Sequence, residues 1–336
     1  MTRSQWLIAS RAVRRTPSPA RWTSQRSTSF ARAGIPTSTR PHSTASSPPI
    51  SSSSSSVSPS EVSHFSRLAS TWWDPHGPSR LLHLMNPLRH DFIQSCLLVS
   101  PSSSMSTSTS TTDHPPPEQS GLSYLDIGCG GGIFASSAAR LPSTQSVTAI
   151  DPTPLVIEVA KSHQRSDPAL SPPKLQYLNC AIEDLPQHHT ATATDAGSSG
   201  SSESSEQKKK KKYDIITVFE VLEHIDSPSA FLDSALTHLK PGGWLVGSTI
   251  SRSPTAWFTT KLIAEAPVIG VVPAGTHDWN KYINPSELQT YFETRASGRW
   301  ADFRTQGVIY VPMLGWRNVN GSEQLGNYFF GVRKVA

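Results

Sequence analysis

Cysteine is scarce in this chain, and so are long apolar stretches. Cys96, Cys129 and Cys180 are the only cysteines among 336 residues, and their spacing matches neither a zinc site nor a disulfide framework. The apolar segments 6–15 and 256–273 are both too short to span a bilayer. A disulfide-stabilised secreted domain is therefore excluded, neither segment predicts a transmembrane helix, and the chain fits a reducing compartment.

Acidic residues are absent from the first 60 positions, which contain eight arginines among many serines, threonines and prolines. This composition is typical of a mitochondrial transit peptide, and residues 6–15 can form a short amphipathic helix with a basic face. We therefore predict that residues 1–60 are a transit peptide and a disordered Ser- and Pro-rich segment, with cleavage before Glu61. A disordered basic tail without a targeting role is the alternative.

The formal net charge of +5 comes entirely from these first 60 residues, so the rest of the chain is net acidic. A lysine run stands at 208–212, but no basic patch with interleaved aromatic residues is present. The sequence therefore gives no indication of nucleic-acid binding. Low-complexity stretches at about 100–120 and 190–212 cannot bury a core, so we expect them to be surface insertions in a domain that spans 61–336.

The segment 124–134, YLDIGCGGGIF, combines an apolar strand pattern with a glycine turn and a helix start. Gly128, Gly130 and Gly132 let the backbone turn sharply and approach a ligand where a Cβ would clash. A second strand pattern ends about 20 residues further on at Asp151, whose carboxylate can accept hydrogen bonds from both hydroxyls of a ribose. Together these features predict a pocket for a nucleotide-type cofactor.

Asp126 ends the first strand and adds a second carboxylate to this pocket. Two carboxylates would repel the pyrophosphate of a dinucleotide, whereas S-adenosylmethionine (SAM) presents an ammonium and a sulfonium. The pattern therefore favours SAM as the cofactor. For a glycine turn taken alone, a tight strand-to-helix connection without a ligand is the alternative.

Strand and helix patterns alternate along the chain, as a parallel sheet requires. We predict strands near 122–127, 147–151, 175–179, 213–218, 244–250, 303–311 and 327–334, and helices near 132–140, 153–165, 228–239, 254–266 and 285–293. With the Pro-Gly-Gly turn at 241–243, these motifs resemble the class I SAM-dependent methyltransferase fold in order and spacing. The resemblance implies an α/β fold with a doubly wound, seven-stranded, mostly parallel sheet and an antiparallel C-terminal hairpin.

Three blocks outside this core are more specific, namely STWWDPHG at 70–77, LMNPLR at 84–89 and GTHDWNKYINPSEL at 275–288. They resemble the ubiquinone-biosynthesis O-methyltransferase family over residues 61–335, apart from the insertions. The resemblance implies SAM-dependent O-methylation of ring hydroxyls of polyprenylated catechol and hydroquinone intermediates. It also implies a place on the matrix side of the mitochondrial inner membrane, together with other ubiquinone-biosynthesis proteins in a complex.

The same resemblance assigns SAM contacts to Arg89, Gly128, Asp151 and Phe219, beside Asp126 and Gly130 from the glycine turn. The planar guanidinium of Arg89 can pair with the methionine carboxylate in a bidentate contact that lysine cannot reproduce. An ordinary surface arginine is the alternative. Phe219 is expected to contribute a backbone or apolar contact.

A divalent cation, with Mg²⁺ preferred, is also implied by the resemblance, through Glu220, Glu223 and His224. If the chain turns helical after the fourth strand, positions i, i+3 and i+4 share one face and can converge on one ion. Two carboxylates suit Mg²⁺, whereas histidine is better tolerated by Zn²⁺ or Mn²⁺. A helix-start cluster held by capping and dipole effects is the alternative.

A phenol must lose its proton before it attacks the methyl group of SAM. We expect coordination by the cation at Glu220, Glu223 and His224 to lower the pKa of the phenol, and direct proton transfer to a base such as His224 is the alternative. His277, with Asp278 beside it, is a second candidate near the substrate mouth. A loop held by side-chain to backbone hydrogen bonds explains that second pair equally well.

The apolar, aromatic-rich segment 256–273 predicts peripheral binding to the membrane surface through Trp257, Phe258 and Ile269. A cover helix packed on the domain is the alternative. Three other functions stay open. They are methylation of carbon or nitrogen, a NAD-dependent oxidoreductase, and a non-catalytic assembly subunit of the biosynthetic complex.

Overall fold

The computed structural model describes residues 56–99, 121–188, 211–260, 278–296 and 298–335, which all belong to one compact unit, Ser53–Ala336. Residues 1–55 of the predicted transit-peptide segment, the insertion at 100–120, most of the insertion at 190–212, His277 and Ile269 lie outside the described residues. Folded structure is present before the predicted domain start at Glu61, since Val57 pairs with Ile225 in an antiparallel bridge and α1 begins at Pro59. Among the described residues, no helix is long and apolar enough to cross a membrane.

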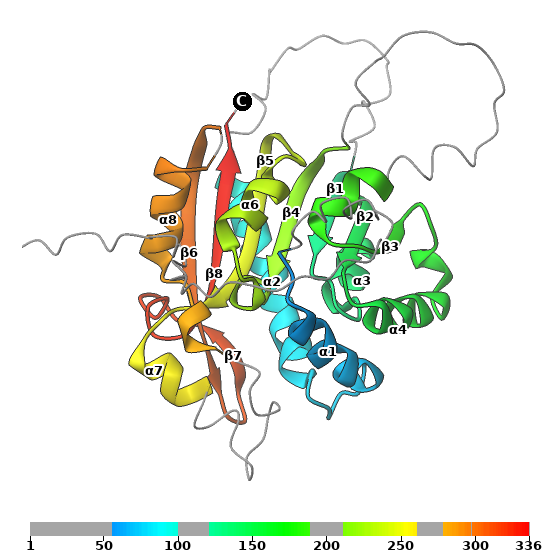
Figure 1. Ribbon diagram of the computed structural model, residues 1–336, viewed down its shortest axis with the longest axis horizontal. Helices are drawn as coiled ribbons and strands as arrows, with labels where there is room; N and C mark the ends of the chain where they lie inside the picture. Colours follow the sequence, from blue (N-terminus) through cyan, green and yellow to red (C-terminus); the bar gives the residue numbers. More distant parts are fainter. Residues whose placement is uncertain (1–55, 100–120, 189–210, 261–277, 297, 336) are drawn as a thin grey trace, which may run out of the picture. The chain divides into compact units, whose positions relative to one another are not determined.

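A mixed sheet forms the centre of the described chain (Figure 1). Its strand order is β3-β2-β1-β4-β5-β8-β6-β7, in which the first five strands are parallel and the last three run antiparallel to their neighbours. The strands are β1 (Leu122–Ile127), β2 (Thr144–Asp151), β3 (Leu175–Asn179), β4 (Tyr213–Phe219), β5 (Leu239–Ile250), β6 (Trp300–Val311), β7 (Gly315–Asn318) and β8 (Asn327–Lys334).

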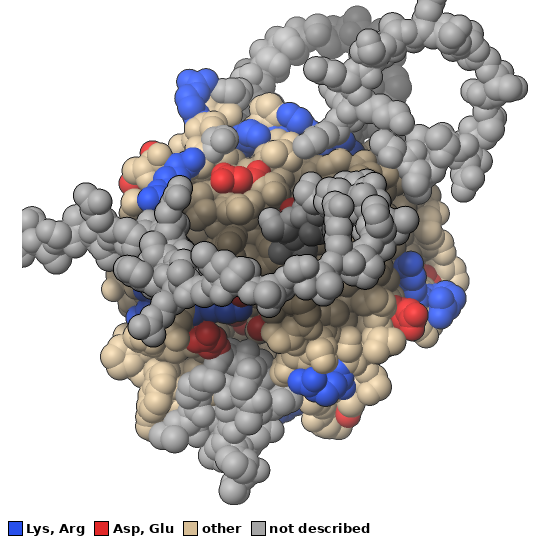
Figure 2. Space-filling view, viewed as in Figure 1, with Lys and Arg blue, Asp and Glu red and all other residues tan. Residues whose placement is uncertain are grey.

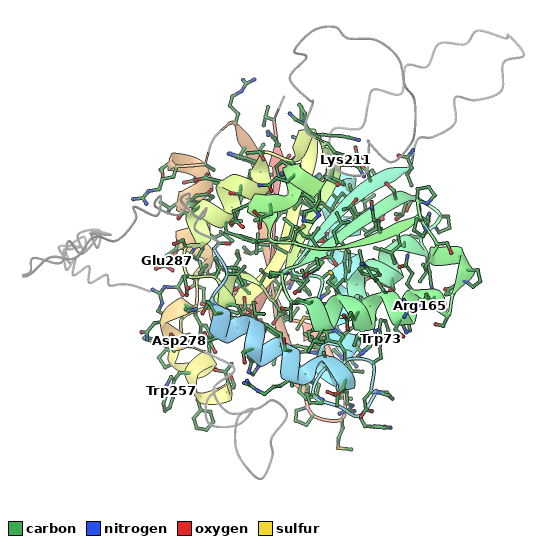
Figure 3. The ribbon with its side chains drawn as sticks, turned by 45° about the vertical axis from the view of Figure 1, so that its right-hand side comes forward. Trp73, Arg165, Lys211, Trp257, Asp278 and Glu287 are labelled. Atoms are coloured by element: carbon green, nitrogen blue, oxygen red, sulfur yellow. The ribbon has the colours of Figure 1, made fainter. Side chains whose placement is uncertain are left out.

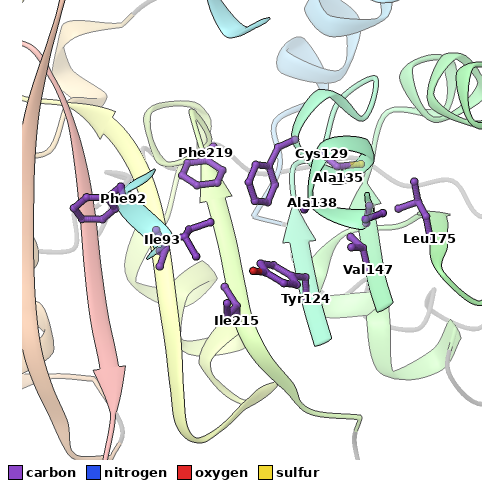
Figure 4. Packing of buried hydrophobic residues seen from close by; sticks show 14 of the residues in the cluster. Phe92, Ile93, Tyr124, Cys129, Ala135, Ala138, Val147, Leu175, Ile215 and Phe219 are labelled. Atoms are coloured by element: carbon purple, nitrogen blue, oxygen red, sulfur yellow. The ribbon is translucent and has the colours of Figure 1, made fainter. Parts of the chain in front are cut away.

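Helices cover both faces of this sheet. The helices of the described chain are α1 (Pro59–Leu68), α2 (Arg80–Val99), α3 (Ile133–Ala139), α4 (Pro154–Arg165), α6 (Pro228–Leu236), α7 (Pro254–Trp257) and α8 (Pro285–Thr294). Short 3-10 turns are η1 (Ala69–Thr71), η2 (Pro168–Leu170), η3 (Ile182–Asp184), η4 (Leu222–His224) and η6 (Trp279–Lys281). Side chains of α2, α3 and α4 pack in one buried cluster on the first face, part of which Figure 4 shows. Those of α6 and α8 pack on the opposite face.

Alternation along the strands explains the two layers. Tyr124 belongs to the first cluster and its neighbour Leu125 to the second, and Ile215 and Ile216 on β4 divide in the same way. Successive strand residues point to opposite faces, so a strand covered on both sides is apolar throughout. This arrangement accounts for the mostly apolar composition of β1 and β4.

The strand order reverses between β1 and β4, where Tyr124 pairs with Ile215 and Asp126 with Thr217. In doubly wound sheets, ligands bind outside the carboxyl ends of the strands at such a reversal. The glycine turn after β1 and the Glu220–His224 segment after β4 therefore meet at one edge.

The predicted α/β fold, with its parallel core and antiparallel C-terminal strands, is confirmed. The described sheet has eight strands rather than seven, because residues after β6 fold back as the short strand β7, with Met313 and Gly315 at positive φ in the turn. Helix α7 ends at Trp257, followed by a π-helical turn to Thr260, so the rest of the predicted helix 254–266 lies outside the described residues. After β4, where an α-helical turn was the condition for the expected metal site, a 3-10 turn stands instead.

Candidate active site

A cavity of about 740 Å³ opens at the carboxyl ends of the strands. The ends of β1, β2 and β4 line it on one side, and α1, α7, β6 and the start of β8 line it on the other. Figure 2 shows that basic and acidic side chains are interspersed over the visible, described part of one face. The residues that line the cavity are mostly apolar, and the few polar groups described below are the exceptions.

The glycine turn after β1 forms part of the cavity wall. Gly128, Gly130 and Gly132 have φ angles of 71°, 51° and 86°, a region that side chains other than glycine rarely adopt. A Cβ on Gly130 would lie 2.2 Å from Cζ2 of Trp72, and one on Gly132 would lie 2.1 Å from the hydroxyl of Tyr177. The predicted need for glycine is therefore both conformational and steric.

Asp151 ends β2 and holds this turn in place. Its Oδ2 accepts a hydrogen bond from the Gly130 N–H at 3.0 Å, and its Oδ1 accepts one from the Thr153 N–H at 2.8 Å. Burial raises the pKa of Asp151, and the two N–H donors oppose this only in part. The carboxylate thus lies in the cavity wall at the position where a ribose is expected.

Asp126 lies deeper, at the end of β1, and is 3% exposed. Its Oδ1 accepts a hydrogen bond of 2.7 Å from the Thr217 hydroxyl, whereas its Oδ2 has no partner among the described residues. Burial raises the pKa of Asp126 to about 7, against the opposing effects of Thr217 and of the positive charge of Arg89. A cationic ligand would therefore be strongly favoured here, because it would stabilise the ionised carboxylate.

Arg89 is a cavity residue rather than a surface arginine. It is 4% exposed, and its guanidinium lies over the Phe219 ring at 4.9 Å from the centroid. Burial lowers the pKa of Arg89, and the charges of Glu220 and Asp126 act in the opposite direction. Its Nε has no partner within the described part of the chain, so a donor is available for a ligand.

Phe219, the last residue of β4, takes part in an aromatic cluster. Its ring meets Phe134 edge to face at 4.8 Å and Phe329 at 6.3 Å between centroids. Figure 4 shows it above Tyr124 and Ile215 on the same side of the sheet. Its side chain therefore forms the cavity floor, in keeping with the apolar contact expected of it.

Glu220 and Glu223 follow β4 and each bind a hydroxyl group at the end of β5. Glu220 has a φ of 56°, and its Oε1 accepts a hydrogen bond of 2.6 Å from Ser248. Glu223 is 4% exposed, and its Oε2 accepts one of 2.9 Å from Thr249. Burial and the nearby charge of Glu220 raise the pKa of Glu223.

His224 bonds in another direction, toward the N-terminal helix. Its Nδ1 lies 3.0 Å from Oε2 of Glu61 on α1, and its ring meets Phe65 edge to face at 5.1 Å. Burial alone would lower the pKa of His224, but the hydrogen bond to Glu61 and the charge of Glu223 raise it above its usual value. Burial alone would raise the pKa of Glu61, and His224 outweighs this, so the pKa is lowered.

The described residues do not fit the predicted metal site. Glu220 lies in a left-handed conformation before η4, so Glu220, Glu223 and His224 do not share one face of an α-helix. Across the described ranges, no group of three or more His, Cys, Asp or Glu side chains is arranged to hold a metal ion. The three side chains bind Ser248, Thr249 and Glu61 instead.

Of the second candidate pair, His277 and Asp278, only Asp278 is described, because His277 lies outside the described residues. Asp278 caps η6, where its Oδ1 accepts hydrogen bonds from the backbone N–H and the side-chain amide of Asn280. It does not line the cavity. For Asp278, the structural alternative of a loop held by its own side chain therefore agrees with the geometry.

The sequence reasoning missed four residues of the site, namely Glu61, Trp72, Ser248 and Thr249. Ser248 and Thr249 could have been predicted as site residues, since they are hydroxyl residues at the end of a buried strand that reaches the same sheet edge. Trp72 stands in the family-specific block 70–77, but nothing in that block indicated a role in the site, and Glu61 had no such indication at all. Their positions depend on how the N-terminal segment folds back over the glycine turn, which no local pattern encodes.

A doubly wound sheet with a glycine turn after its first strand, a carboxylate after its second and a cavity at the strand reversal defines a SAM-dependent methyltransferase. Residues 107–301 match a family model described as "Methyltransferase domain". Comparison with curated proteins gives the particular family. A mitochondrial ubiquinone biosynthesis O-methyltransferase from Candida albicans is 38% identical over 309 residues, covering 83% of this chain and 86% of that protein.

Further relatives carry the same name. The mitochondrial protein of Schizosaccharomyces pombe is 38% identical over 290 residues, covering 83% of this chain and 87% of its own length. The Albidiferax ferrireducens protein is 33% identical over 279 residues, covering 82% and 90%. The chain belongs to the ubiquinone biosynthesis O-methyltransferase family and is a SAM-dependent O-methyltransferase.

Proposed function

We propose that this chain transfers the methyl group of SAM to ring hydroxyls of polyprenylated catechol and hydroquinone intermediates in ubiquinone biosynthesis. The observation that carries the proposal is that the wall of one cavity contains both groups of residues. Asp151 and Gly128 form the proposed donor end, and Glu223 and His224 form the proposed acceptor end. A donor and an acceptor bound in one enclosed space can react without diffusing between sites.

The acceptor end of this cavity suits an apolar ring with an apolar substituent. Its wall includes Phe65, Ile250, Val308, Trp316 and Leu325. Side chains of this kind bury hydrocarbon favourably, whereas a free polar catechol would gain little from them. This lining supports a prenylated rather than a soluble acceptor.

Positioning supplies most of the rate in this mechanism. The sulfonium of SAM is already a good leaving group, so the protein must hold a phenolate oxygen in line with the methyl carbon and exclude water. Arg89, Asp126 and Asp151 hold the donor. The apolar walls hold the ring.

His224 is the proposed general base. A phenol with a reference pKa of about 10 must give up its proton near neutral pH, and histidine is the side chain best matched to that task. The Glu61 carboxylate bonded to Nδ1 fixes the ring and leaves Nε2 to accept the phenol proton. Glu223 and Glu220 add negative charge, which stabilises the imidazolium that forms.

A divalent cation, with Mg²⁺ preferred, would be held by Glu220, Glu223 and His224. The segment after β4 would have to rearrange to bring the three side chains together, since they do not form a metal-binding group in the described structure. Carboxylate oxygens suit Mg²⁺ in general. Retention of activity in excess chelator would exclude a required cation.

Localisation and partners follow from the family and the N-terminal composition. We propose import into mitochondria and peripheral contact with the matrix side of the inner membrane, beside other ubiquinone-biosynthesis proteins. Trp257 and Phe258 support the membrane contact, since each is 49% exposed at the end of α7, next to Thr259 of the cavity wall (Figure 3). Sedimentation with inner-membrane-like liposomes should fall when both are replaced by serine, and unchanged sedimentation would refute this contact.

The function itself is tested with the full-length protein, SAM and a catechol carrying a short prenyl chain. We expect an O-methylated product by mass spectrometry, and much slower turnover of catechol without the chain. A protein that binds SAM but methylates neither catechol would point to a non-catalytic subunit. A product methylated on carbon would point to a different methyltransferase.

A further inference from the structure

Trp72 lines the cavity, and its indole Nε1 forms no hydrogen bond within the described part of the chain. It is 7% exposed and follows η1, and its indole covers Gly130 and Gly131, with Nε1 3.0 Å from where a Cβ on Gly131 would lie. Buried indole N–H groups usually have a hydrogen-bond partner, so this donor calls for a ligand.

The neighbouring tryptophan has a structural role instead. The Trp73 Nε1 donates to the Gly131 carbonyl at 2.9 Å, and its ring stacks on His163 with centroids 3.5 Å apart. Trp73 does not line the cavity, whereas Trp72 does. The two indoles therefore hold the same turn, and only one has a donor left for the cavity.

Three further cavity residues have unpaired buried atoms within the described chain, namely the hydroxyl of Ser56, the Nε of Arg89 and the Oδ2 of Asp126, and the last two belong to charged groups. Two donors and one carboxylate match a group that carries a carboxylate next to an ammonium, as the amino-acid end of SAM does. The other end of SAM is served by Asp151, which lies after β2. The unpaired donors and the carboxylate are thus complementary to the charged groups of an α-amino acid.

We propose that the indole N–H of Trp72 donates a hydrogen bond to the α-carboxylate of SAM, beside Arg89. Trp72 is then a binding residue of the donor site, and the first tryptophan of the Trp-Trp-Asp block has a role in ligand recognition. The inference rests on SAM as the methyl donor and adds one contact to that site.

The test compares a protein variant that lacks the indole N–H with the wild type, and a ligand that lacks the carboxylate with one that has it. Calorimetry compares S-adenosylhomocysteine, which keeps the amino-acid end, with 5′-methylthioadenosine, which lacks it. We expect Trp72→Phe to weaken S-adenosylhomocysteine binding about 10-fold or more, because a hydrogen bond to a charged group is lost. Binding of 5′-methylthioadenosine should change by no more than about twofold.

Trp73→Phe is the matched control. It removes a hydrogen bond that shapes the turn, so it should affect both ligands to a similar extent. If Trp72→Phe lowers both affinities equally, or neither, the proposed contact does not exist. Failure of the wild-type protein to bind S-adenosylhomocysteine would instead count against SAM as donor.

A spectroscopic readout keeps the test decisive if Trp72→Phe does not fold. In the wild-type protein, one indole N–H resonance should move downfield when S-adenosylhomocysteine binds and stay in place when 5′-methylthioadenosine binds. The indole N–H of Trp316, the other tryptophan of the cavity wall, already donates to the Leu81 carbonyl at 3.0 Å. Absence of any indole resonance that responds selectively would overturn the proposal.

Discussion

The proposed donor end and the proposed acceptor end of the cavity are built in different ways. At the donor end, the glycine turn and Asp151 come from one strand–turn–helix–strand unit, and the Gly130 N–H bonds directly to Asp151. At the acceptor end, His224 depends on Glu61, which is 163 residues away in sequence, and Glu220 depends on Ser248. The first site is thus local in sequence, and the second is assembled from distant segments.

This difference has a chemical reason. Every donor molecule is the same, so a fixed turn with few degrees of freedom suffices to bind it. The acceptor must be held together with a base while a proton moves, and this requires a polar cluster whose charges are set by several chain segments. Changes at the two ends should therefore affect different measurements.

The largest effect is expected at the acceptor end. His224→Asn removes the proposed base, so kcat should fall by about 10²- to 10⁴-fold, because general-base catalysis contributes that much. Affinity for S-adenosylhomocysteine should change by about twofold at most. Steady-state kinetics and calorimetry measure the two quantities.

His76→Asn serves as the control, because His76 is exposed and does not line the cavity. It should leave kcat unchanged. A His224→Asn enzyme of normal kcat would remove this residue from the mechanism and move the base role to His277.

Sequence patterns captured the donor end well. The glycine turn, Asp126 and Asp151 stand at the strand ends where they were predicted, because a buried strand, a glycine turn and a helix start constrain one another over about 30 residues. Arg89 was expected at the donor site only from the family resemblance, and the structure places it in the cavity wall.

Sequence patterns failed where distant contacts compete with local ones. The i, i+3, i+4 spacing of Glu220, Glu223 and His224 predicted a helical face, yet Glu220 adopts a φ of 56° and bonds to Ser248 on β5. The helix that supplies Glu61 packs over the cavity through contacts that no single segment specifies. Propensity and spacing cannot foresee a tertiary partner of this kind.

The next largest effect belongs to the donor end. Asp151→Ala removes an acceptor for both ribose hydroxyls and frees two backbone N–H groups, so SAM affinity should fall by about 10²- to 10³-fold. Calorimetry with S-adenosylhomocysteine measures the change. Asp167→Ala, which breaks the exposed pair with Arg140 and the cap on the Ala169 N–H, both outside the cavity, should have no effect on this affinity. If the Asp151→Ala protein still supported ubiquinone production in cells, the donor site would not be catalytic.

Stability separates the steric role of the turn from its conformational role. Gly130→Ala places a Cβ against Trp72 at a φ of 51° and should cost about 2–4 kcal/mol of unfolding free energy. Gly242→Ala is the matched control, with a φ of 79° and no atom within 4 Å of the new Cβ. It should cost only about 1–2 kcal/mol. Urea denaturation compares them, and equal losses would mean that the approach of Trp72 is not tight.

The smallest effect concerns the bond between α1 and η4. Glu61→Gln should lower stability by about 1–2 kcal/mol near pH 5.5, because a partly buried charged hydrogen bond becomes neutral. Because the pKa of His224 is raised in the folded protein, its contribution to folding stability is fully present below its unfolded pKa of about 6.5. That contribution is lost as the pH rises through the folded pKa. The lowered pKa of Glu61 means that its contribution is present above about 4.5 and is lost as pH falls through its folded value.

The difference between wild type and Glu61→Gln should therefore be greatest between about pH 4.5 and 6.5 and should shrink on both sides. NMR titration of the His224 ring should give a lower pKa in the variant. Because a base must be neutral to accept a proton, the rise of kcat with pH should move to lower pH in the same variant. A His224 pKa and a pH–rate profile that both stay unchanged would show that α1 covers the acceptor end without tuning its base, and that the two ends of the cavity are less different than their contacts suggest.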